Sequence, residues 1–469
     1  LDAAGYQTRR GDIKRVNGKG ESMTFETKGK ENNGATYGRR SDWQDLYSIA
    51  KKYYEALLAD PGNALFHLTD PRGASDKSGR TFNNPYQYFF EQMHMDDAIY
   101  ADESIYEYPM QQGGGNDGRP YSFGRPSSGG SKAAYPCKSY GQGRINPAYF
   151  YGVFDPNDMR RDVSITMTGS NGKGVEKLIP FVPNSKAEGG GLTLNKWDEN
   201  RQANPWVAAQ RKSGINGPYM RMSEVYLGYA EVCAALGDVV TGKQYLKTVR
   251  ERSFPQGLAN TDAFIASFGN DLVRAIIEER GFEYAGEGDR RWTLIRSGYL
   301  PEDIKRIKDM TKAMMDGLAT KGYYEFENGN IISAYIWTKL VDAKTIYGHR
   351  LTAQCPTDKV NDPVLYPGWR GQKDNWEEMG LNYGSSTPAT NLAIKGLFEI
   401  VSEEEAASLE SQGYTKVNWG IDLVDNRDEY DKYLFWDYDY VSAPIYLWPF
   451  TPNVMAAGGF TNGYGFKQE

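Results

Sequence analysis

The chain has 469 residues and a formal net charge of −7, from 54 Lys and Arg against 61 Asp and Glu. This length accommodates one large domain or two to four domains of ordinary size. A net negative charge without a basic stripe argues against nucleic acid as a partner and against binding to an anionic membrane surface. Aromatic residues form 13% of the chain and can supply a hydrophobic core, so we do not expect a disordered protein.

No run of about 18 apolar residues is present, so we expect no membrane-spanning helix. The sequence starts at Leu1, and no charged and then apolar leader follows. We therefore expect that an N-terminal portion is missing. Any signal peptide, and any lipid anchor through which the protein reaches a membrane, would lie in that portion.

The few cysteines and histidines limit the chemistry that the chain can perform. Cys137, Cys233 and Cys355 are odd in number and far apart, so they predict no disulfide framework. Cys233 lies within an apolar helical pattern and is predicted to be a buried thiol. The three histidines have no metal-ligand spacing. We expect no cofactor, although a structural calcium ion bound by Asp and Glu oxygens stays open.

Helical periodicity first appears over residues 42–59, where five apolar positions recur at helical spacing: Leu46, Ile49, Ala50, Tyr53 and Leu57. A short helix is predicted over residues 86–95. Residues 111–147 contain glycine and serine runs with several prolines, and they predict a long loop. Residues 162–167 have the pattern of a strand.

Residues 219–298 predict four helices, at about 220–236, 242–253, 271–285 and 289–297. The large and small residues of the first pair have the spacing of a degenerate tetratricopeptide hairpin. Further helices are predicted near 302–318 and 403–412, and the tail over 446–465 predicts a strand followed by an extended loop. The fold class is therefore mainly α, a tetratricopeptide-like helical-repeat scaffold with large irregular loop insertions and a few short strands. Because one or two such repeats are not stable alone, we expect other helix pairs in residues 1–60 or in the missing portion, with Leu1–Tyr6 as the tail of an earlier helix.

Several segments carry a resemblance to a known family. They are residues 154–162 (FDPNDMRRD), 219–231 (YMRMSEVYLGYAE), 245–253 (YLKTVRERS), 277–296 (IEERGFEYAGEGDRRWTLIR) and 446–450 (YLWPF). In this order and spacing they resemble the SusD/RagB family of Bacteroidetes outer-membrane nutrient-binding lipoproteins. The chain departs from the family pattern at Lys247, where Asn is usual, at Gly281, where Arg is usual, and at Phe450-Thr451, which replace Ile-Pro.

The resemblance implies one SusD-like domain over residues 1–469 that lacks its N-terminal portion. Residues 41–60 and 219–298 would form the helical-repeat scaffold, while 61–218 and 299–469 would form loop-rich insertions and the closing segment. The implied function is that of a surface-exposed lipoprotein of the bacterial outer membrane. It would capture a glycan or oligosaccharide without chemistry and pass it to a SusC-like TonB-dependent transporter.

Two alternatives stay open at this stage. A peptide-binding member of the same family would carry the same motifs, because those motifs do not encode the class of ligand. A secreted glycoside hydrolase would need a pair of carboxylates across the scissile bond, and Asp437 and Asp439 are the pair that fits best.

Glycan binding requires flat aromatic faces together with side chains that hydrogen-bond to hydroxyl groups. Loops of the chain supply both types of residue, and the candidates for ligand contact are Trp197, Asn200, Arg201, Trp369, Asn375 and Trp376. Each tryptophan could equally pack its own loop.

The motif over residues 277–296 has a structural interpretation. Its acidic and basic side chains lie at helix-neighbour spacings and predict intramolecular ion pairs: Glu279, Arg280, Glu283, Glu287, Arg290 and Arg296. Trp292 is predicted to pack in the helical core.

Overall fold

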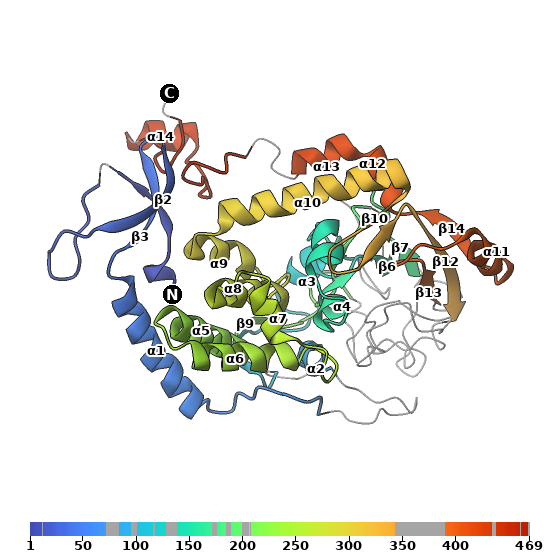
Figure 1. Ribbon diagram of the computed structural model, residues 1–469, viewed down its shortest axis with the longest axis horizontal. Coiled ribbons are helices and arrows are strands. Elements are labelled where there is room, and N and C mark those ends of the chain that lie inside the picture. Colours follow the sequence, from blue (N-terminus) through green and yellow to red (C-terminus); the bar gives the residue numbers. More distant parts are fainter. Residues whose placement is uncertain are drawn as a thin grey trace.

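A computed structural model describes residues 1–11, 13–71, 84–94, 101–115, 118–127, 138–170, 176–183, 189–198, 206, 208–342, 390–433, 438–459 and 461–467. Its centre is a group of helices flanked by a small sheet at each side, and a long helix runs across the top of the view (Figure 1).

The central helices match the helical periodicity of the sequence. They are α1 (Trp43–Ala59), α5 (Met222–Ala235), α6 (Val239–Glu251), α7 (Thr261–Ala266), α8 (Leu272–Glu283), α9 (Asp289–Ser297) and α10 (Leu300–Lys321). Asp238 and Asp271 cap α6 and α8, because their side chains accept hydrogen bonds from the backbone N–H groups of Thr241 and Arg274. The helices predicted over 42–59 and 219–298 are confirmed, and Cys233 is buried as expected.

A three-stranded antiparallel sheet opens the chain, in the order β1-β3-β2. Its strands are β1 (Gln7–Arg10), β2 (Phe25–Asn32) and β3 (Ala35–Arg40). Leu1–Tyr6, predicted as the tail of an earlier helix, contains a 3-10 turn, η1 (Asp2–Ala4), directly before β1.

The C-terminal tail runs beside this sheet, close to α14 (Pro452–Gly458) in Figure 1. The backbone N–H of Ala443 donates to the carbonyl of Lys30 over 2.8 Å, and Lys30 N–H donates to Val441 over 2.9 Å. Gly29 permits this approach, because its φ is +71° and a Cβ there would lie 2.5 Å from the Val441 carbonyl oxygen. The strand predicted at 446–450 is wrong, and α14 replaces part of the predicted extended loop.

A second three-stranded sheet lies at the other side of the molecule, where β12 (Tyr335–Asp342) pairs with both β13 (Thr390–Lys395) and β14 (Thr415–Asn418). Beside it are α11 (Glu403–Ser411), α12 (Gly420–Asp425) and α13 (Arg427–Tyr433). The helices predicted near 302–318 and 403–412 are thus confirmed.

The insertion between α1 and α5 folds into short elements. They are α2 (Pro85–Gln92), β4 (Ser104–Tyr108), α3 (Gly118–Phe123), a π-helical turn η2 (Tyr149–Val153), α4 (Arg160–Ser164), β5 (Ile165–Thr166), β6 (Thr168–Ser170), β7 (Glu176–Leu178), β8 (Thr193–Leu194) and β9 (Gly217–Arg221). Two further strands follow α10, β10 (Tyr323–Glu325) and β11 (Ile331–Ser333). The helix predicted at 86–95 is present as α2, which ends at Gln92, and the predicted loop 111–147 contains α3. The strand predicted over 162–167 is correct only from Ile165, because residues 160–164 continue as a helix.

A buried network of ion pairs joins these elements. Glu283 on α8 accepts hydrogen bonds from Arg160 over 3.0 Å, Arg221 over 2.5 Å and Arg252 over 2.6 Å, and all four side chains are shielded from solvent. The ion pairs predicted for the 277–296 motif are therefore present. Their partners, however, come mainly from other elements rather than from helix neighbours, since the acidic side chains of α8 point into the interior.

The prediction that Trp292 packs in the core is wrong, because its side chain is 55% exposed. The buried face of α9 starts one residue later, at Thr293, and continues through Arg296, whose guanidinium pairs with Glu231. The first turn of α9 is instead held at its edges by the pairs Asp289–Arg280 and Arg290–Glu278. Trp292 thus contributes little to the core.

Candidate functional site

The structure describes only one of the six residues that the sequence nominates for ligand contact. Asn200, Arg201, Trp369, Asn375 and Trp376 lie outside the described residues. Trp197 is described and follows β8.

The Trp197 side chain is only 2% exposed and packs with Leu194 and Ile215. Its carbonyl accepts a hydrogen bond from the Arg125 backbone N–H over 2.8 Å. Of the two roles that the sequence left open for Trp197, these contacts favour packing of its own loop.

Arg119, on α3, lies beside the Trp197 ring. The Arg119 guanidinium lies 5.6 Å from the Trp197 ring and 6.0 Å from the ring of Tyr108 on β4, so it stands between a buried and an exposed aromatic group. It also lies directly over Gly217, where a Cβ would come within 1.3 Å of Arg119 Nη1. A side chain at position 217 would therefore displace this guanidinium group from its observed position.

Three exposed tyrosines gather on the two-stranded sheet of β4 and β9. Tyr106, Tyr108 and Tyr219 are 54%, 55% and 72% exposed, and we call them the tyrosine face. The Tyr219 ring lies 5.5 Å from Tyr106 and 6.4 Å from Tyr108, centroid to centroid. Tyr219 therefore forms the middle of a continuous aromatic surface.

Strand geometry explains this arrangement. Alternation along β4 places Tyr106 and Tyr108 on one face and turns Glu107 inward, where it is 1% exposed. Glu107 accepts hydrogen bonds from the Ala101 N–H and from the Asn216 side chain. An irregularity in the pairing register, between the partners of Tyr106 and Glu107, gives Tyr219 no direct cross-strand partner.

Buried charges fix the base of the tyrosine face. Arg221 ends β9 and donates to Glu283 and Glu287, and the Lys196 ammonium lies 2.7 Å from the same Glu287. Burial lowers the pKa of Lys196 to about 8, although Glu287 acts in the opposite direction. The strand that carries Tyr219 and the segment that carries Trp197 are thus both bound to the Glu287 carboxylate.

The carboxylate pair that the sequence nominated for hydrolysis is Asp437 and Asp439. Asp437 lies outside the described residues, and Asp439 accepts hydrogen bonds from the N–H groups of Val441 and Ser442, as a turn-capping residue does. Within the described ranges, His, Cys, Asp and Glu form no group of three or more that could hold a metal ion. None of the described helices is both long enough and apolar enough to cross a bilayer.

The sequence analysis did not predict the tyrosine face. Its one local signal is the alternation Tyr106-Glu107-Tyr108, and Tyr219 was included in a family motif. The contact between β4 and β9, which lie far apart in the chain, creates the site.

Comparison with known proteins shows which proteins the chain is similar to. A 160-residue stretch is 28% identical to SusD-like protein P25 of Formosa agariphila and covers 34% of this chain and 26% of that protein. Among solved structures, a SusD homologue from Bacteroides thetaiotaomicron is 18% identical over 57% of this chain and 51% of its own, with a TM-score of 0.37. Surface glycan-binding protein A from Bacteroides fluxus is 18% identical over 55% and 49%, with a TM-score of 0.39.

The chain thus spans about a quarter of the curated relative and about half of each solved structure. The sequence profile of the SusD family matches residues 65–449, which include the tyrosine face and most of the helical scaffold. Because this match extends over most of the chain, the protein belongs to the SusD family.

Proposed function

We propose that this protein binds an oligosaccharide at the bacterial cell surface, and that the tyrosine face is a principal contact. The observation that carries the proposal is the exposure of three adjacent tyrosines on one two-stranded sheet. The apolar C–H face of a sugar ring can stack on an aromatic ring, while the tyrosine hydroxyl remains free to hydrogen-bond to sugar hydroxyls. Membership of the SusD family supports a binding role rather than catalysis.

The sequence candidates stay within this proposal. Asn200 and Arg201 follow Trp197 closely in the chain, and with Trp369, Asn375 and Trp376 they would supply further ligand contacts. Trp197 itself would not contact the ligand but would hold Arg119 in place next to Tyr108. The proposal includes no cofactor and no enzymatic turnover, and a peptide is the alternative ligand.

We expect the Tyr219→Ala variant to bind its oligosaccharide about 10- to 30-fold more weakly, because truncating a central aromatic contact typically costs about 2 kcal/mol. A panel of neutral hexasaccharides, including laminarihexaose, maltohexaose and xylohexaose, would identify a ligand, and calorimetry would measure its affinity. Tyr53→Ala is the matched control, because Tyr53 lies on α1 and is 71% exposed, almost the same as Tyr219. Equal affinities in the two variants would refute the tyrosine face.

Two other assays distinguish the alternatives. If parallel arrays detect binding of peptides but of no glycan, the ligand is a peptide rather than an oligosaccharide. Release of reducing ends from a bound glycan would indicate a glycoside hydrolase.

We also propose that the protein acts at the outer membrane, held there by an N-terminal lipid anchor, and delivers its ligand to a SusC-like TonB-dependent transporter. The supporting feature is an apolar tail surface next to the first sheet, where Ile445, Leu447, Trp448 and Phe450 are 43%, 40%, 89% and 56% exposed. Several exposed apolar side chains within one short segment are a feature that protein interfaces cover.

The expected result is co-purification of the full-length, anchored protein with a large β-barrel from outer membranes. Since a stable complex buries about 1,600 Å² or more, the association should survive mild detergent. Recovery of the anchored protein alone would contradict the proposed partner.

A further inference from the structure

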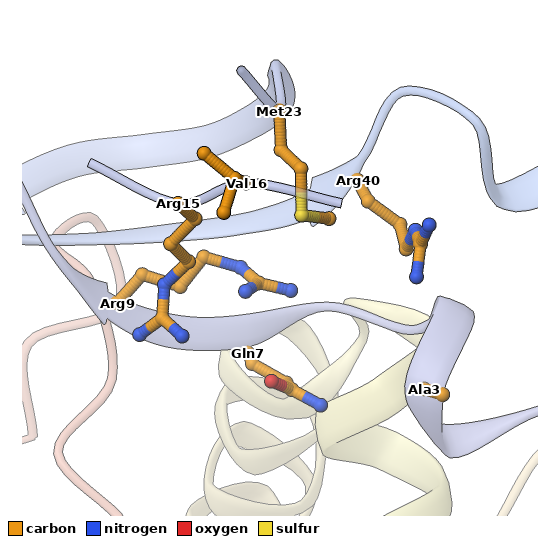
Figure 2. A pocket seen from close by; sticks show the side chains of 7 residues that line it. All are labelled: Ala3, Gln7, Arg9, Arg15, Val16, Met23 and Arg40. Atoms are coloured by element: carbon orange, nitrogen blue, oxygen red, sulfur yellow. The ribbon is translucent and has the colours of Figure 1, made fainter. Parts of the chain in front are cut away.

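A second candidate site lies on the first sheet, outside the residues that match the SusD family. An open pocket on this sheet has a volume of about 430 Å³. Figure 2 shows the side chains that line it. Its lining consists of Ala3, Gln7, Arg9, Arg15, Val16, Met23 and Arg40. The sheet lies apart from β9 in Figure 1, so this pocket is separate from the tyrosine face.

Three arginines give the pocket its character. Arg9 belongs to β1 and Arg40 ends β3, while Arg15 comes from the connection between β1 and β2. In Figure 2 the Arg9 side chain lies between those of Arg15 and Arg40. A cavity with three guanidinium groups concentrates positive charge in a protein whose net charge is −7.

Arg9 is held in a fixed position. Its side chain is 8% exposed, its Nε donates to the Gly38 carbonyl over 3.0 Å, and its guanidinium stacks 4.3 Å from the Phe25 ring. Within the described part of the chain, no carboxylate forms an ion pair with Arg9. Burial lowers the pKa of Arg9, and the nearby charges of Arg15 and Arg40 lower it further, whereas Tyr446 acts in the opposite direction.

Arg15 is also without a carboxylate among the described residues, and its Nε is buried without a hydrogen-bond partner there. Arg40, by contrast, makes a two-pronged contact with Asp42, at 2.5 and 2.6 Å. The other nearby carboxylates have partners of their own: Glu26 pairs with Arg39, and Asp2 approaches Arg296. The pocket therefore contains two guanidinium groups with no counter-charge from the described protein.

Buried charges in proteins are normally paired, because removing an ion from water without compensation is costly. A guanidinium group presents parallel N–H donors that match the two oxygens of a carboxylate or a sulfate. From this geometry we infer that the pocket binds an oxyanion, a carboxylate or sulfate group, between Arg9 and Arg15. Val16 and Met23 add an apolar wall that suits a carbon skeleton attached to the anion.

The anion could be free or could be a substituent of a saccharide, and titration calorimetry at low salt distinguishes these sources. The probes are sodium sulfate, sodium glucuronate, hexagalacturonate and the neutral laminarihexaose. Binding of sulfate or glucuronate alone supports a free-anion site, and binding of hexagalacturonate alone supports a uronate on a saccharide. If none of the three anionic probes binds, the inference is overturned.

Arg15→Gln should weaken anion binding by about tenfold or more, since a hydrogen bond between charged groups is lost. Arg15→Lys keeps the positive charge but loses the parallel N–H donors of the guanidinium group. This variant should bind the anion with intermediate affinity. The matched control is Lys14→Gln, which removes one exposed positive charge next to the pocket but outside its lining. An equal loss of affinity in Lys14→Gln would mean that general electrostatic attraction, not the pocket, binds the anion.

Tyr219→Ala serves as an independent control, because it alters the other site. Anion affinity should remain within about threefold of the wild-type value in this variant. Failure of the tyrosine face to bind glycan would thus leave the oxyanion site unaffected, and the reverse also holds. A loss of anion binding in Tyr219→Ala would contradict the inference that the pocket and the tyrosine face are two separate sites.

Discussion

Replacing Glu283 with glutamine should lower the free energy of unfolding by about 3–5 kcal/mol, the range typical of removing one partner from a buried ion pair. The amide keeps the size of the side chain but cannot neutralise Arg160, Arg221 and Arg252, which all contact this carboxylate. Urea denaturation monitored by tryptophan fluorescence measures the change. The control is Glu251→Gln, because Glu251 forms only an exposed pair with Lys247 at 3.5 Å and should change stability by less than about 1 kcal/mol.

The same carboxylate should contribute to acid sensitivity. Burial by itself would raise the pKa of Glu283, but the charges of Arg252, Arg221 and Arg160 outweigh it and hold the pKa well below its usual range. A carboxylate with a lowered pKa in the folded state stabilises the protein above the unfolded pKa of about 4.3, and this stabilisation is lost as the pH falls below it. The wild-type protein should therefore lose stability more steeply than Glu283→Gln between about pH 5 and pH 3. If the free energy of unfolding of the two proteins falls equally with pH over this range, Glu283 does not contribute to acid sensitivity.

Local patterns predicted the helices well and their partners poorly. The periodicity of residues 220–297 depends on near neighbours in the chain, and α5, α6, α8 and α9 follow it closely. The charges of the 277–296 motif were recognised as ion-pairing residues, yet Glu283 pairs with Arg160, which lies 123 positions away. Helix spacing cannot reveal such a partner, because it is set by how α4 packs on α8.

Exposure was the least predictable property. Trp292 is large and apolar but lies on the first turn of α9, before the buried face begins. For Trp197 the sequence left ligand contact and loop packing open, and the structure buries its side chain. The tyrosine face depends on the pairing of β4 with β9 and on an irregular register at Tyr219. None of these features is encoded in a short stretch of sequence.

Truncation of Trp197 to alanine should destabilise the protein by about 3–5 kcal/mol, as expected for a buried tryptophan. The indole packs with Leu194 and Ile215 and supports Arg119, so its loss leaves a cavity beneath the tyrosine face. Trp292→Ala is the matched control, because that side chain is 55% exposed and its removal should change the free energy of unfolding by about 0.5 kcal/mol or less.

Both variants should be compared by urea denaturation, with oligosaccharide affinity measured at a temperature at which each is fully folded. For Trp197→Ala we expect a large loss of stability and a smaller loss of affinity, through the displaced Arg119 and Tyr108. The opposite pattern, unchanged stability with abolished binding, would show that Trp197 contacts the ligand directly. It would also mean that the segment after β8 opens when the sugar binds, because a side chain with 2% exposure cannot stack on a ligand while it remains packed.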